Sequence, residues 1–106
     1  MDLRRGLARS LRLIRKARGL AQSQLADAAG RTYLSEIERG VKNPTVEKID
    51  RLARAMKVHP LTVLTIAYLA RLEEKELLDL QERVDKETRS VLSKADAAQP
   101  RKARTG

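Results

Sequence analysis

The sequence predicts an all-α protein, made of a five-helix domain and one additional C-terminal helix. Apolar residues recur at intervals of three and four from about residue 3 to residue 94, which is the spacing of helices that bury one face. Glycines at positions 19, 30 and 40 divide the first part of this pattern into short segments. Beyond Pro60 there is no proline until Pro100 and no glycine before the last residue, so the second part can form longer helices.

The first three helices are each expected to stop at a glycine. The first covers about residues 3–18, after which Gly19 can adopt the left-handed conformation of a helix C-terminus. A short second helix over about residues 22–29 and a third over about residues 31–39 end in the same way. Their inward-facing apolar residues are expected to be Leu7, Leu11, Ile14, Leu25, Ala26, Ala29, Leu34 and Ile37.

The fourth and fifth helices have recognisable start signals. Thr45 is a favourable N-cap for the fourth helix, and Pro60 suits the first turn of the fifth. The buried residues expected in the fourth helix are Ile49, Leu52, Ala53 and Met56. The stretch Leu61–Ala70 is uncharged and largely apolar around its circumference, so we expect it to be buried on more than one face.

The remaining residues predict an amphipathic helix followed by a tail. Leu77, Leu80 and Val84 follow a spacing of three and four, and a change of phase before them predicts a bend or break near residues 73–76. The last twelve residues contain no core-forming side chain. The expected division is a folded domain at residues 1–70, an amphipathic helix at 71–94 and a flexible basic tail at 95–106.

The composition argues against an enzyme and against a metal or cofactor site. Cysteine is absent, which excludes disulfides, thiolate metal sites and thiol catalysis. His59 is the one histidine and precedes Pro60, so it is expected to start a helix rather than bind a metal. The carboxylates after Arg71 alternate with basic residues, which is typical of a solvated helix face rather than an acid–base cluster.

The positive charge is concentrated in the first part of the chain. The net charge is +9, and residues 1–59 contribute +8 of it, with 14 basic and 6 acidic side chains. Such a basic unit indicates a polyanionic partner, although a basic surface that only improves solubility is the alternative. Only two residues are aromatic, which argues against single-stranded nucleic acid. No apolar run is long enough to span a membrane, and we expect a cytoplasmic, nucleoid-associated protein.

Residues 22–39 carry the strongest functional pattern. Two short helices joined at a glycine are typical of a helix-turn-helix. If Leu34 and Ile37 point inward, the third helix presents a polar outward face. That face consists of Arg31, Thr32, Ser35, Glu36 and Arg39. An exposed polar helix suits the major groove, where all four base pairs can be distinguished; an ordinary solvated helix face is the alternative.

Three sequence pieces resemble the lambda-repressor-like (XRE) helix-turn-helix family over about residues 7–64. They are Gln22-Ser-Gln-Leu-Ala26, Tyr33-Leu-Ser-Glu-Ile-Glu-Arg-Gly40 and Asn43-Pro-Thr45. The resemblance implies a bacterial or phage transcription regulator that binds double-stranded DNA. Such regulators are usually dimers on a palindromic operator, and a repressor is the favoured type.

The resemblance also implies a role for individual residues. The residues expected to face base edges are Arg31, Thr32, Ser35 and Glu36. The residues expected to contact phosphates are Gln22, Arg39, Lys42 and Asn43, with Gln22 at a helix N-terminus that favours anions. A largely buried structural ion pair between Arg15 and Glu38 is expected as well, because a carboxylate on the inner side of a helix requires a partner.

Two departures from the family pattern concern the second and third helices. Gly30 meets Arg31 directly, about two residues short of the usual turn, so an apolar residue between the helices and a hydroxyl cap on the third helix are missing. Ala21 stands where Ser or Thr usually caps the second helix. That change costs about 1 kcal/mol unless Ser23 compensates.

The C-terminal apolar residues predict a homodimer. Two helix-turn-helix units related by a two-fold axis contact half-sites about 34 Å apart, and the apolar surface beyond residue 60 exceeds what one small domain requires. The expected interface residues are Leu61, Leu64, Tyr68, Leu77, Leu80 and Val84. Two alternatives remain: residues 71–94 fold back on their own domain, or the C-terminal helices bind another protein, as in an antitoxin that represses its own operon.

Overall fold

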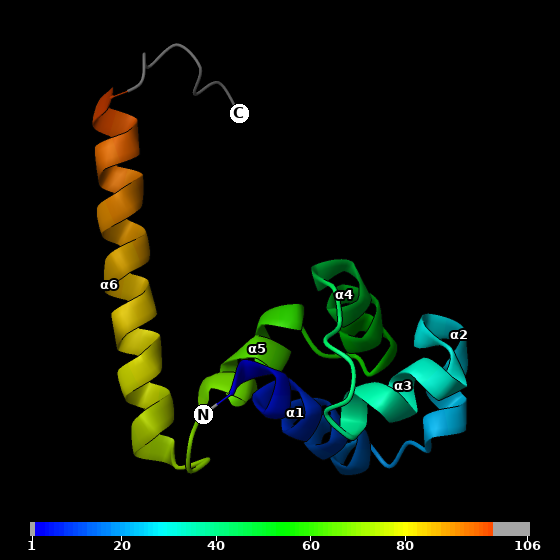
Figure 1. The fold of residues 1–106 in the computed structure, drawn as a ribbon. Coiled ribbons are helices and arrows are strands. Elements are labelled where there is room, and N and C mark those ends of the chain that lie inside the picture. Colours follow the sequence, from blue (N-terminus) through cyan, green and yellow to red (C-terminus); the bar gives the residue numbers. More distant parts are fainter. Residues whose placement is uncertain (1, 99–106) are drawn as a thin grey trace. The chain divides into compact units, whose positions relative to one another are not determined.

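The computed structural model describes residues 2–98, apart from the side chains of Arg31 and Ala98, and the regular structure of this part is helical (Figure 1). The helices are α1 (Leu3–Ala17), the 3₁₀ helix η1 (Gln22–Leu25), α2 (Ala26–Ala29), α3 (Arg31–Glu38), α4 (Val46–Ala55), α5 (Pro60–Tyr68) and α6 (Glu74–Ala98). The predicted all-α fold of five helices and a C-terminal helix is confirmed, with the second helix divided into η1 and α2. The chain forms two compact units, and the boundary between them in the sequence lies between Leu72 and Glu73.

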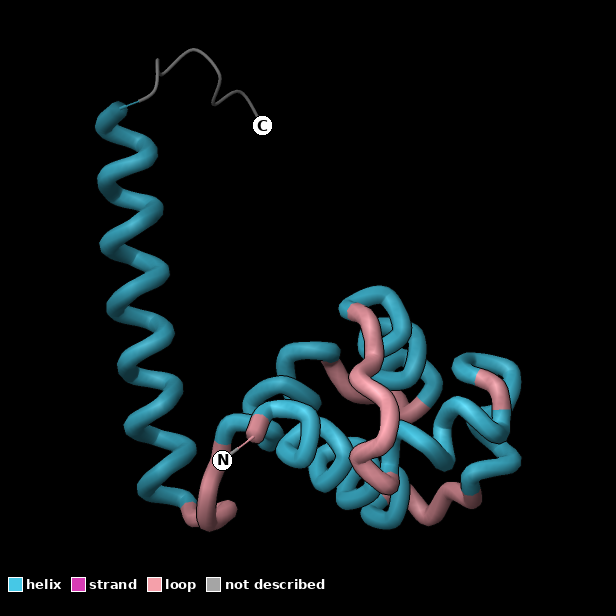
Figure 2. The backbone as a smooth tube through the Cα atoms, viewed as in Figure 1, coloured by secondary structure: helices cyan, strands magenta, loops and turns pink. Residues whose placement is uncertain are grey.

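One apolar core holds the first unit together. Every helix from α1 to α5 contributes to it, and short loops join these helices (Figure 2). Its buried members are Leu7, Leu11, Ile14, Leu25, Ala29, Leu34, Ile37, Ile49, Leu52, Ala53, Met56, Val63 and Ala67. The inward faces predicted for the first four helices are thus confirmed, except that Ala26 is only partly buried.

Helices α1 and α5 lie in close contact. A side chain at Gly6 would collide with the backbone of Ala67, so this position requires glycine. The buried Ser10 hydroxyl donates a hydrogen bond of 2.7 Å to the carbonyl oxygen of Val63. The Arg9 guanidinium donates to the carbonyl oxygens of Ile66 and Leu69, near the C-terminal end of α5. Polar side chains of α1 therefore tie α1 to backbone carbonyl groups in the middle and at the C-terminal end of α5.

The expectation that Leu61–Ala70 is buried on more than one face is wrong for the single chain. Val63 and Ala67 are buried, whereas Leu61 and Tyr68 are each 62% exposed. The reason is that the main neighbours of α5 are α1 and α4, which leave part of the circumference of this nine-residue helix uncovered. Its other face remains open to solvent.

The predicted start signals of α4 and α5 are confirmed. Thr45 Oγ1 accepts a hydrogen bond of 3.1 Å from the Lys48 backbone N–H, as an N-cap does. His59 Nδ1 accepts one of 3.0 Å from the Leu61 N–H, with Pro60 in the first turn. His59 is therefore a helix-start residue.

The second unit consists, in its described part, of α6. The chain leaves helical conformation after Tyr68 and returns to it at Glu74, so the break is longer and begins earlier than the predicted bend at residues 73–76. Leu69 is extended and buried, and Leu72 has a positive φ of 57°, which together interrupt the helical backbone. No helix in the described part is both long and apolar enough to cross a membrane.

Part of the predicted flexible tail is helical. Helix α6 continues to Ala98, so the expectation for residues 95–98 is wrong. These residues are Ala95, Asp96, Ala97 and Ala98, and alanine has the highest helix propensity of all residues. The rest of the expected tail, residues 99–106, lies outside the described residues.

Candidate nucleic-acid interface

Helix α3 presents one polar face because its apolar residues point into the core. Leu34 and Ile37 are almost fully buried, and this fixes the rotation of the helix about its axis. On the opposite side Thr32 and Arg39 are exposed, and Ser35 and Glu36 are partly exposed. The backbone of Arg31 begins α3, but its side chain lies outside the described part. From the sequence, Arg31, Thr32, Ser35 and Glu36 are expected to face base edges, and Arg39 is expected to contact a phosphate.

A hydrogen-bonded network around Glu38 holds the C-terminal end of α3. Glu38 is only 4% exposed. Arg15 donates to both of its carboxylate oxygens, with Nε at 2.7 Å from Oε2 and Nη2 at 2.9 Å from Oε1. Gln22 Nε2 donates to the same Oε1 at 3.0 Å. The expected ion pair between Arg15 and Glu38 is thus present, and it is bidentate, which is the strong and directional form of this contact.

The network keeps Glu38 ionised. Burial raises the pKa of the Glu38 carboxyl, but hydrogen bonds from Arg15 and Gln22, with the positive charges of Arg15 and Arg12, outweigh burial and hold that pKa below its ordinary value. The hydrogen bond to Glu38 raises the pKa of Arg15, although burial acts in the opposite direction. The buried pair therefore stays charged at neutral pH.

A second arginine of α1 contacts the same end of α3. Arg12 Nη1 donates a hydrogen bond of 2.9 Å to the backbone carbonyl oxygen of Glu38, where the last carbonyl groups of α3 carry partial negative charge. Arg15 Nη1 also donates to the Leu20 carbonyl oxygen at 2.8 Å. Helix α1 thus links the end of α3 to the loop that precedes η1. The sequence gives no signal for this role of Arg12, because only the tertiary structure brings residues 12 and 38 together.

Fewer side-chain contacts hold the N-terminal end of α3 than hold its C-terminal end. Gly30 alone joins α2 to α3, with φ of 85° and ψ of 138°, and no side chain caps α3. This backbone conformation is accessible to glycine but strained for other residues. Tyr33 packs against the edge of the core, and Lys48 Nζ of α4 lies 5.2 Å from the centre of its ring, a cation–π distance. Tyr33 was not singled out from the sequence, where a lone tyrosine gives no such signal.

The capping contact found at Ala21 comes from Gln24 rather than from Ser23, and no side chain replaces the missing hydroxyl. Gln24 Oε1 accepts a hydrogen bond of 2.7 Å from the Ala21 backbone N–H. This is one half of a capping box, the half that the residue at the third helical position supplies.

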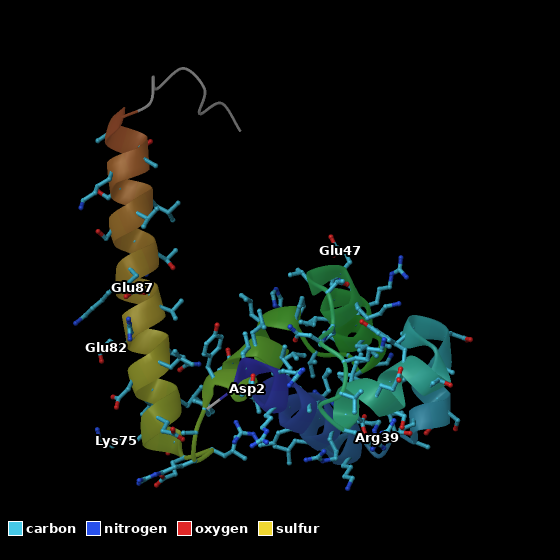
Figure 3. The ribbon with its side chains drawn as sticks, viewed as in Figure 1. Asp2, Arg39, Glu47, Lys75, Glu82 and Glu87 are labelled. Atoms are coloured by element: carbon cyan, nitrogen blue, oxygen red, sulfur yellow. The ribbon has the colours of Figure 1, made fainter. Side chains whose placement is uncertain are left out.

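The other expected phosphate-contacting residues surround α3. Gln22 in η1 is partly buried against Glu38. Arg39 lies at the end of α3 (Figure 3). Lys42 and Asn43 are exposed in the next loop, whose backbone is held by hydrogen bonds from Val41 and Lys42 to the Glu36 carbonyl oxygen. Among the described residues, no three His, Asp or Glu side chains gather in a way that could hold a metal ion.

Comparisons with known proteins agree with this arrangement. A family model described as Helix-turn-helix matches residues 11–63. An uncharacterised HTH-type transcriptional regulator of Sinorhizobium fredii is 34% identical over 67 residues, which are 61% of this chain and 87% of that protein. The control protein C.SmaI of Serratia marcescens is 36% identical over 67 residues, 61% of this chain and 80% of that one.

A phage protein matches over a longer segment. The immunity repressor protein of Bacillus phage phi105 is 33% identical over 93 residues, which are 81% of this chain and 64% of the repressor. No solved structure matches the chain.

Proposed function

The chain belongs to the XRE-type helix-turn-helix family of DNA-binding transcriptional regulators, and we propose that it is a repressor that binds a palindromic operator as a homodimer. The observation that carries the proposal is the polar face of α3, because the buried Arg15–Glu38 pair anchors this helix at one end. A fixed polar helix can present the same donors and acceptors to every DNA molecule, which sequence recognition requires.

We assign base recognition to Arg31, Thr32, Ser35 and Glu36. The hydroxyl groups of Thr32 and Ser35 can donate or accept, while the Glu36 carboxylate can accept a hydrogen bond from cytosine N4. The positions of Thr32, Ser35 and Glu36 on the outward side of α3 support the assignment. Gly30 makes the turn before α3 shorter than the usual family turn. The length of this turn therefore sets where the start of α3 lies relative to the major groove.

Contacts to phosphates are assigned to Gln22, Arg39, Lys42 and Asn43. Gln22 uses one amide N–H on Glu38 and keeps a second N–H for a phosphate oxygen. The contact with Glu38 fixes the orientation of that amide before DNA arrives, so less side-chain entropy is lost on binding. Lys42 and Asn43 are exposed beside the end of α3 and would position the protein on the backbone without reading sequence.

The assignment of a homodimer is supported by apolar surface outside the core. Leu61 and Tyr68 are mostly exposed on α5, and Leu64 is partly buried against its own core. Leu77, Leu80 and Val84 lie along α6 and are at least partly exposed. A two-fold symmetric pair would cover these side chains and place two α3 helices on successive half-sites.

Selection from a random double-stranded DNA pool at about 0.15 M salt tests the proposal, since non-specific phosphate binding is weak under these conditions. We expect a palindrome with half-sites about one helical turn apart. On that site Ser35→Ala should change the preferred sequence, whereas Lys42→Ala should weaken all sequences alike and lower the salt slope by about 1. Lys75→Ala on α6 is the control and should change neither. Binding without any recovered motif would contradict the proposal.

A further inference from the structure

Helix α6 carries apolar side chains at the spacing of a coiled coil. Leu77, Leu80, Val84 and Val91 follow one another at intervals of three, four and seven residues, and Val84 and Val91 are at least half exposed. In a heptad pattern they occupy core positions, with residues 77, 84 and 91 at one core site and residue 80 at the other. A helix with this pattern can bury its stripe against a second helix of the same kind.

We propose that α6 pairs with α6 of a second copy of this chain, and that the two helices run antiparallel. The proposal rests on the homodimer proposed above and adds the orientation of its C-terminal helices. Two independent features of the sequence on α6, the identity of its core residues and the distribution of charge along it, favour this orientation.

The core positions argue against a parallel pair. Continuing the heptads from Leu80 places Glu87 and Lys94 at core sites. In a parallel, in-register pair each of these residues would face its own copy, so that two carboxylates and then two ammonium groups would meet. Juxtaposed like charges cost several kcal/mol at an interface. In an antiparallel pair each faces a valine or leucine instead, and its aliphatic stem can cover that side chain while the charge reaches water.

In the antiparallel arrangement one layer pairs two apolar residues, and the others pair an apolar residue with the stem of a charged one. With α6 overlapped along all but one residue of its length, so that residue 74 lies opposite residue 97, Leu80 lies opposite the partner's Val91, and Val84 lies opposite the stem of the partner's Glu87. Glu87 already forms an ion pair with Arg83 on its own helix, at 3.0 Å. The negative charge of the Glu87 carboxylate is thus balanced by Arg83 of the same helix and needs no basic residue from the second α6.

Charge along α6 gives the second argument. Residues 73–82 contain five carboxylates and one lysine, a net charge of −4, whereas residues 83–96 contain four basic and three acidic side chains, a net charge of +1. A parallel pair would place the two acidic halves side by side, within the distance of about 8–10 Å over which charges interact in physiological salt. An antiparallel pair places each acidic half beside the more basic half of its partner.

Disulfide trapping in the full-length chain tests the orientation, because the natural sequence contains no cysteine. Single variants Leu80→Cys and Val91→Cys are oxidised separately and as an equimolar mixture. We expect cross-linked dimer mainly in the mixture, at least about tenfold above either variant alone, since a difference of 1.4 kcal/mol between orientations already gives that ratio. The matched control is a mixture of Glu82→Cys and Arg89→Cys, two positions on the outward face of α6, which should not cross-link.

Two results would overturn the proposal. Efficient cross-linking of Leu80→Cys with itself would show a parallel pair, and no cross-linking above the outward-face control would show that α6 does not pair. Either result leaves the proposed operator binding to be judged by DNA selection, because a recovered palindrome would then indicate dimerisation through another surface.

Discussion

Glu38 connects the fold of this protein to its proposed function. A carboxylate buried without compensation would be costly, but here Arg15 and Gln22 donate to both of its oxygens. The same contacts fix the end of α3 and orient the Gln22 amide. One residue that cannot itself reach DNA thus determines the position of several that are proposed to do so.

Replacing Glu38 should be far more damaging than breaking an exposed ion pair. Glu38→Ala leaves the Arg15 guanidinium largely buried and unpaired, and we expect a loss of about 3–5 kcal/mol in the free energy of unfolding. Asp50→Ala, which breaks the exposed pair with Arg54, should cost less than about 1 kcal/mol. Urea denaturation measures both values. Equal losses in the two variants would show that the Glu38 network contributes no more than a surface pair.

The acid dependence of stability should follow from the same network. Because the pKa of Glu38 is lowered in the folded protein, the unfolded chain binds more protons than the folded one between that lowered pKa and the ordinary value of about 4.3. The stabilisation is therefore complete above the ordinary value and is lost as the pH falls through the folded pKa. The isosteric variant Glu38→Gln removes this titration, so its unfolding free energy should fall less steeply below about pH 5.

At the scale of the elements, the two ends of α3 are held in different ways. Its C-terminal end is tied to α1 by Arg12 and Arg15, whereas its N-terminal end follows Gly30 without a side-chain cap. The helix before the turn is also unusual, since Ala21 occupies its N-cap and only Gln24 provides a capping contact. The polar side of the helix-turn-helix is therefore more firmly positioned near residue 38 than near residue 31.

Completing the capping box at η1 should stabilise the protein. Ala21 already has the extended backbone of an N-cap, with φ of −84° and ψ of 158°, and Gln24 stands three residues later. Ala21→Ser would add the reciprocal hydrogen bond to the Gln24 N–H, and we expect a gain of about 0.5–1 kcal/mol in the free energy of unfolding. Ala21→Val is the control, because valine cannot accept this bond. A serine variant no more stable than the valine variant would contradict the expectation.

At the scale of the whole molecule, the two units draw on different sources of stability. The first has an apolar core whose buried cluster runs from Leu7 to Ala67. The exposed ion pairs along α6 include those between Lys75 and Asp79, Glu82 and Lys86, Arg83 and Glu87, and Asp85 and Arg89, each spaced four residues apart. Such pairs stabilise a helix by about 0.2–0.5 kcal/mol each, which is little compared with the burial of a core.

Removal of residues 73–106 should therefore separate folding from dimer formation. We expect the shortened chain to stay folded, with an unfolding free energy within about 1 kcal/mol of the full chain measured as a monomer. Its affinity for a palindromic operator should fall by at least about tenfold, because each unit would then bind its half-site without the linkage to the other. Circular dichroism and DNA titration measure the two effects. Loss of helical structure in the shortened chain would show that α6 is part of the first unit's core.

The sequence by itself determined the fold class, most helix boundaries and the inward faces of the first four helices. The physical reason is that these features depend on local properties: a helical period of 3.6 residues, the backbone freedom of glycine and the capping preference of threonine. The same locality explains why Leu34 and Ile37 were enough to predict which side of α3 is polar.

Only the tertiary structure decided which residues act together across the chain. Arg12 and Gln22 contact the end of α3 although they are 26 and 16 residues from Glu38, and no periodicity encodes such a contact. The open face of α5 and the extent of the break before α6 also depend on which neighbours pack against each helix. Local spacing determines which face of a helix is apolar, but only the packing of the other helices determines how much of that face is covered.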